Sequence, residues 1–226
     1  LGPLFPVNCA RRREPWKLTR HSNLFITLQR VMINLLSDMS DAFKARDVAL
    51  RAQKKILSKM AHKNVAKAFI SEATSSLLDN IYRLAKVKNG GNKKEAEKVV
   101  KNLIKIVIKV GILNKNDQFS QQDIKVAQNF QSKFQAISKA VISFYEVDFS
   151  YDRNYLMKSL EESHQLLRTL VRSHLTDKSL DRIDDIYKFF NDATFLDNVF
   201  NKNWTHRPLV GKIIADMHHL IEEGSL

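Results

Sequence analysis

Residues 93–115, KKEAEKVVKNLIKIVIKVGILNK, constrain the fold of this chain more than any other segment. Apolar residues recur there at spacings of three and four, which predicts an α-helix. They fill about half of the helix circumference, whereas an ordinary surface helix buries a narrower stripe. We therefore expect apolar partners, or an apolar cavity, on most sides of this helix. The remaining side is expected to face solvent as a cationic ridge of five lysines, namely Lys94, Lys98, Lys101, Lys105 and Lys109.

The rest of the chain also has few residues that interrupt helices. Only six glycines and four prolines occur in 226 residues, and three of the prolines precede residue 16. Helical periodicity predicts further helices over about 64–86, 124–144, 152–175, 179–191 and 206–222, and Ser120 with Asp123 resembles a capping box. No strand pattern competes. The sequence predicts an all-α domain of six or seven helices over 61–226, preceded by a flexible basic arm (1–22) and an amphipathic helical segment (23–60).

The sequence predicts an amphipathic helix with a basic face over residues 42–60. Leu50 and Leu57 are seven residues apart on its apolar face. Such a helix can lie on an anionic membrane with its apolar side below the headgroups, where Leu50 and Leu57 would dock. The alternative is that both leucines pack on the domain. The opposite face carries Arg51, Lys54, Lys55 and Lys59.

Charge is distributed unevenly along the chain. Residues 1–119 hold 24 basic and 9 acidic side chains, against 13 and 15 in residues 120–226. A basic half indicates a polyanionic partner, either an anionic membrane surface or nucleic acid. Single-stranded nucleic acid needs exposed aromatic side chains for stacking, but the phenylalanines here lie at or next to core positions of predicted helices. We therefore expect a membrane partner and no nucleic acid.

Motifs that carry chemistry are missing from the sequence. There is no glycine-rich phosphate loop, no Cys/His metal spacing and no nucleophile elbow, so we predict neither an enzyme nor a metal or other cofactor. The single cysteine, Cys9, excludes an internal disulfide framework and favours a reducing setting. No apolar run approaches the roughly 20 residues of a membrane span. We expect a cytoplasmic protein that associates with membranes peripherally.

Several stretches resemble one known family. They are AQKKILSKM (52–60), TSSLLDNIYRLAK (74–86), NKKEAEKVVKNLIKIVIKVGIL (92–113), NDQF (116–119), SFYEVDFSYDRN (143–154) and HLTDKS (174–179). The chain resembles the tumour necrosis factor alpha-induced protein 8 family, or TIPE proteins, in order over about 44–226. The resemblance implies a helical bundle around a central hydrophobic cavity that accepts phospholipid tails. It also implies that an amphipathic helix, which contacts membranes, precedes this bundle in the chain.

The same resemblance implies a headgroup site. Basic residues at the cavity mouth hold phosphoinositide headgroups in this family, and the matching positions here are Lys54, Lys55 and Lys115. Arg51 and Lys59 are expected to assist them. A further family arginine falls at Gln131, where Lys133 or Lys125 could compensate, and a family His-Gly pair is replaced by Leu180-Asp181.

The wide apolar faces of 93–113 and 124–144 are the expected walls of the cavity, although a fully packed core would give the same composition. The residues predicted to line it are Leu78, Ile81, Leu103, Val107, Val110, Phe130, Phe134, Ile137, Val141, Leu160 and Leu167. The leading hypothesis is a phosphoinositide-binding and transfer protein that regulates apoptosis, immunity and cell migration. The alternative is a death-effector-like adaptor that binds signalling proteins and transfers no lipid.

Overall fold

The structure is a computed structural model that describes residues 47–48, 51–52 and 72–222. Within these residues it contains helices and no strand, so the all-α prediction is confirmed. The arm (1–22) and most of the amphipathic segment (23–60) lie outside the described residues. The helices are α3 (Glu72–Lys88), α4 (Lys93–Lys115), α5 (Gln121–Glu146), α6 (Arg153–Val171), α7 (Asp177–Phe190), α8 (Ala193–Phe200) and α9 (Arg207–Glu222).

Short polar side chains begin most of these helices. Asn92, Asp152 and Asp192 accept hydrogen bonds from backbone N–H groups in the first turns of α4, α6 and α8. Ser120 and Asp123 form the predicted capping box, in which each side chain accepts from the backbone N–H of the other. Such caps satisfy N–H groups that have no partner within the helix, so the connections of the bundle are set locally.

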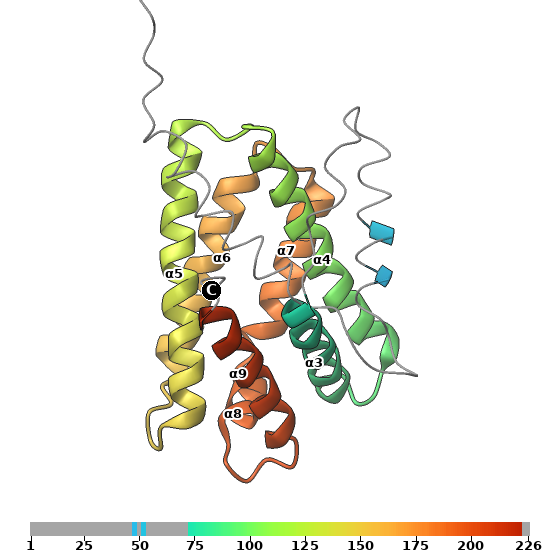
Figure 1. The fold of residues 1–226 in the computed structure, drawn as a ribbon, viewed down its shortest axis with the longest axis vertical. Coiled ribbons are helices and arrows are strands. Elements are labelled where there is room, and N and C mark those ends of the chain that lie inside the picture. The colour runs from blue at the N-terminus through green and yellow to red at the C-terminus, as the bar shows by residue number, and fades with distance from the viewer. Residues whose placement is uncertain (1–46, 49–50, 53–71, 223–226) are drawn as a thin grey trace, which may run out of the picture.

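The helices close into a ring (Figure 1). Helix α3 packs on α4, α4 on α7, α7 on α6, α6 on α5, α5 on α9, and α9 returns to α3. The short helix α8 packs against α6 and α9 at one end of this ring. A helix in such a ring has neighbours on both flanks and also faces the interior, which explains why α4 needs apolar residues over so much of its circumference.

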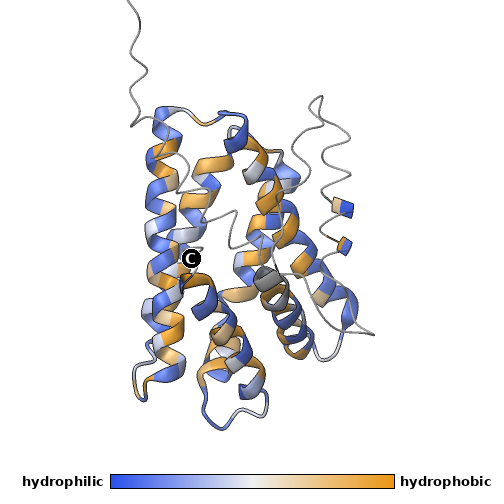
Figure 2. Cartoon of the chain, in the orientation of Figure 1, coloured by the Kyte–Doolittle hydropathy of each residue, from blue (hydrophilic) through white to orange (hydrophobic). Residues whose placement is uncertain are grey.

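The core is divided into two clusters of buried side chains. The larger one contains Ala96, Val100, Ile104 and Ile108 of α4 together with residues of α3 and α5 to α9. The smaller one joins α4 to α5, α6 and α7 through residues such as Val110. Orange apolar segments accordingly turn toward the middle of the bundle (Figure 2). None of the described helices is long and apolar enough to cross a membrane.

The lysines of α4 form only part of the solvent ridge that the sequence indicates. Lys94 and Lys98 are exposed, but Lys101, Lys105 and Lys109 are half-buried. Lys98 Nζ lies 3.1 Å from a carboxylate oxygen of Asp185 on α7, and Lys109 donates a hydrogen bond to Ser179 Oγ on the same helix. The lysine face of α4 therefore contributes to the α4–α7 contact, which sequence spacing alone could not reveal.

Candidate functional site

An apolar cavity of about 360 Å³ lies inside the ring. Side chains from every described helix, α3 to α9, contribute to its wall. Residues of both core clusters line it, for example Ile104 of the larger one and Ile183 of the smaller one. The cavity thus occupies the space between two separately packed parts of the core, in the size range of small-molecule sites.

The cavity wall offers a ligand almost no polar contact. Among the described lining residues, only Ser138 and Tyr187 carry a polar side-chain group. Ser138 Oγ donates to the carbonyl oxygen of Phe134 at 3.0 Å, and the Tyr187 hydroxyl lies 2.7 Å from Ser163 Oγ. Because both hydroxyls have protein partners, the cavity suits hydrocarbon and would leave a buried polar ligand group unsatisfied.

The residues predicted to line a cavity all occur in this wall. Leu78 and Ile81 come from α3. The others come from one face of α4 and from α5 and α6. Whether the cavity holds a ligand stays a prediction. These lining residues are Leu78, Ile81, Leu103, Val107, Val110, Phe130, Phe134, Ile137, Val141, Leu160 and Leu167.

The predicted headgroup residues are not brought together within the described residues. Lys115 is the last residue of α4 and is exposed. Arg51 is also exposed, and its Nε donates to the carbonyl oxygen of Asp47 at 3.0 Å. Near it, Val48 and Ala52 pack against the larger core cluster. The other predicted headgroup and docking residues, Lys54, Lys55, Lys59, Leu50 and Leu57, lie outside the described residues.

The positions that differ from the family pattern have ordinary surroundings. Gln131 is half-buried on α5, and the neighbouring Lys133 forms an ion pair with Glu162 of α6. Lys125 is exposed in the first turns of α5. Leu180 is buried in the smaller core cluster, so its apolar side chain belongs to the packing of α7.

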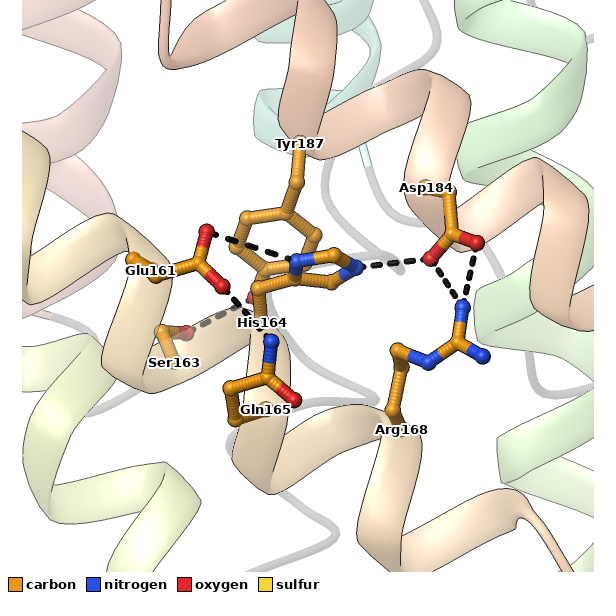
Figure 3. A network of polar contacts seen from close by, with 7 residues as sticks. All are labelled: Glu161, Ser163, His164, Gln165, Arg168, Asp184 and Tyr187. Atoms are coloured by element: carbon orange, nitrogen blue, oxygen red, sulfur yellow. Dashed lines mark hydrogen bonds and ion pairs between the residues drawn. The ribbon is translucent and has the colours of Figure 1, made fainter.

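A polar network supports the cavity wall between α6 and α7 (Figure 3). The ring of His164 stacks on that of Tyr187 with centroids 4.7 Å apart, and His164 Nε2 lies 2.7 Å from Asp184 Oδ1. Arg168 forms an ion pair with the same carboxylate. This network fixes the outer side of Tyr187, whose inner side lines the cavity. Sequence spacing could not reveal it, because its members come from two helices.

The network shifts the proton affinities of its members. Burial raises the pKa of Tyr187 to about 12, so its hydroxyl stays protonated and remains a hydrogen-bond donor. Burial also acts to raise the pKa of Asp184, but the hydrogen bonds from Arg168 and His164 outweigh it and bring that pKa below its usual value. Asp184 is therefore an anion that holds two α6 side chains at neutral pH.

Comparison with known proteins extends over most of the chain. The family model described as "Tumor necrosis factor alpha-induced protein 8-like" matches residues 43–224. A "Tumor necrosis factor alpha-induced protein 8-like protein" of Drosophila pseudoobscura pseudoobscura is 52% identical over 186 residues, which cover 82% of this chain and 98% of that protein. "Protein salivary glands marred" of Drosophila melanogaster is 50% identical over the same proportions of the two chains.

Vertebrate relatives match over a similar length. "Tumor necrosis factor alpha-induced protein 8" of Bos taurus is 38% identical over 187 residues, which cover 83% of this chain and 94% of that protein. The family match includes every helix from α3 to α9. The chain belongs to the tumour necrosis factor alpha-induced protein 8 family.

Proposed function

We propose that this protein binds phospholipids and transfers phosphoinositides between membranes and the cytoplasm. The acyl chains enter the central cavity, and the headgroup stays outside, next to Lys115, Lys54 and Lys55. The protein acts in signalling that controls apoptosis and immunity, and no catalytic step is involved. The observation that best supports this proposal is the cavity itself, which is lined by apolar side chains and whose two hydroxyls are satisfied by the protein.

The size of the cavity sets the amount of hydrocarbon that it accepts. At roughly 30 Å³ for a group the size of a water molecule or a methylene, 360 Å³ accommodates about a dozen groups. Each buried methylene contributes about 0.8 kcal/mol, so one acyl chain of that length supplies on the order of 10 kcal/mol before the costs of association.

A substitution that fills the cavity tests this function. Val107 lines the cavity in the middle of α4, so Val107→Trp places a large side chain in space that acyl chains would occupy. We expect at least a tenfold lower rate of phosphoinositide transfer between donor and acceptor vesicles. The fold should survive, because added volume that enters an empty cavity strains the core less than overpacking does.

The matched control is Val99→Trp. Val99 lies on the same helix and is also half-buried against the core, but it does not line the cavity. Transfer by the Val99 variant should stay close to that of the unmodified protein. Circular dichroism checks that both variants remain helical. If both are folded and transfer phosphoinositides at equal rates, a function based on the cavity is contradicted, and the adaptor hypothesis becomes the stronger one.

A further inference from the structure

The exposed apolar side chains of the described residues gather in one place. The large hydrophobic residues that are exposed there are Val147, Phe149 and Tyr155, all in or next to the connection between α5 and α6. Phe149 is fully exposed. Scattered single apolar residues on a surface need no explanation, but a group confined to one connection does.

The backbone at Phe149 is in a conformation that bulky residues avoid. Its φ of 61° lies in the left-handed region, which places a Cβ-bearing residue under steric strain. The following Ser150 hydroxyl lies 2.9 Å and 2.7 Å from the carbonyl oxygens of Ser143 and Val147, which holds the turn in place. The fold thus maintains a strained turn whose aromatic side chain is not buried by any of the residues that the structure describes.

This connection shares one end of the bundle with the loop between α8 and α9 (Figure 1). Lys202 of that loop forms an ion pair with Asp148, and its Nζ lies 5.6 Å from the centre of the Phe149 ring. Nearby, Arg153 forms an ion pair with Asp197, and His218 Nε2 lies 2.6 Å from Glu146 Oε1. We define the apolar tip as Val147, Phe149 and Tyr155. Opposite charges are paired around it, so the tip offers no strong attraction to an anionic partner.

Aromatic rings connect the apolar tip to the cavity. The ring of Tyr155 lies 6.3 Å from that of Phe144, which in turn lies 5.8 Å from that of Phe200. Phe200 lines the cavity. Lys115 lies at the other end of α5, across a helix of 26 residues that is about 39 Å long. The tip therefore lies at the opposite end of α5 from Lys115.

We propose that the apolar tip inserts into the surface of a lipid bilayer, with Phe149 as its deepest side chain. The tip protrudes and is aromatic, and Lys202 stands beside it with a charged end that can remain at the headgroups while the rings enter the apolar layer. Because the surrounding charges are paired, insertion depends on apolar burial and does not require anionic lipid. The choice of a bilayer over a protein partner rests on the proposed function, since the tip continues into the cavity wall.

Vesicle binding by the full chain tests insertion. Phe149→Asn removes the apolar ring, and Asn tolerates a positive φ, so the turn should be kept; Phe149→Trp retains an aromatic ring. On phosphatidylcholine vesicles at physiological salt, we expect about a tenfold lower partition coefficient for Phe149→Asn and an unchanged one for Phe149→Trp. Binding by Phe149→Asn equal to that of the unmodified protein overturns the proposal, as does the absence of any binding to these vesicles, which would leave the tip to a protein partner.

A depth measurement locates the inserted residue. With Cys9→Ser as background, an environment-sensitive dye is attached at Phe149→Cys or at Gln122→Cys, an exposed position at the far end of α5. The dye at position 149 should be quenched by nitroxide-labelled lipid, and the dye at position 122 should not. If the protein binds vesicles but the dye at position 149 is not quenched and reports an aqueous environment, the proposal of insertion is overturned. Lipid retained by the unmodified protein, read by native mass spectrometry, tests the cavity separately. If the protein carries lipid but vesicle binding does not depend on Phe149, only the proposal of tip insertion is contradicted. If vesicle binding depends on Phe149 but the protein carries no lipid, only the proposed function is contradicted.

Discussion

Asp184 shows how single residues hold the cavity wall in place. Its carboxylate accepts from Arg168 and lies against His164, which stacks on Tyr187 of the wall. Asp184 is partly exposed, with 42% of its side chain accessible, so solvent screens these interactions and limits their contribution to stability. The residue matters chiefly because it joins α6 to α7 next to the cavity.

Asp184→Asn should lower the free energy of unfolding at pH 7 by about 1 kcal/mol, or the melting temperature by about 2–4 °C. The folded-state pKa of Asp184 lies below its unfolded value. Stability from this carboxylate is therefore present above about pH 4 and is lost as the pH falls through the folded-state pKa. Thermal unfolding between pH 7 and pH 3 should show the two proteins converging at low pH.

The matched control is Asp181→Asn, one turn earlier on α7, where the side chain is exposed. We expect this variant to melt within about 1 °C of the unmodified protein. Equal losses for both variants, or a difference for Asp184→Asn that persists undiminished at pH 3, would show that the Asp184 network does not stabilise the α6–α7 contact.

At the scale of elements, α4 shows what periodicity can and cannot predict. Its bounds and wide apolar face follow from its own sequence, because 3.6-residue periodicity is a local property. Its lysine face is a solvent ridge only in part, because Ser179 and Asp185 contact it. Local periodicity could not reveal these contacts, since both residues are on α7, far along the chain. A connection at 147–151 is evident from the sequence, but the positive φ of Phe149 within it is not, because no glycine or asparagine marks that position.

The basic face of 42–60 gives a prediction at the same scale. Lys54→Gln with Lys55→Gln should weaken sedimentation with phosphoinositide vesicles by about thirtyfold, because each lysine near an anionic surface contributes about 1 kcal/mol and two are removed. The control pair is Lys93→Gln with Lys94→Gln, which removes the same charge from the exposed start of α4. Equal effects of the two pairs would indicate general charge attraction and contradict a specific headgroup site.

At the scale of the whole molecule, the ring of helices places a cavity between two core clusters. The sequence could predict which segments are helical, in which order they occur, and where caps such as Ser120 with Asp123 begin them, because these features depend on local sequence. The lining residues were identified from apolar faces together with family resemblance. Composition alone favours a packed core, and the resemblance is what indicated a cavity. Both need the same apolar residues, and the difference lies in how closely side chains such as Val107 and Phe134, which line the cavity, pack.

The central claim is that this cavity holds phospholipid acyl chains. Its most direct test is native mass spectrometry of the unmodified full chain after incubation with vesicles that contain phosphatidylinositol phosphates, followed by removal of the vesicles. The account predicts a species heavier than the bare chain by the mass of one phospholipid, with the lipid identified after dissociation. A protein that shows only the mass of the bare chain, while remaining folded and active in vesicle binding, would contradict the claim.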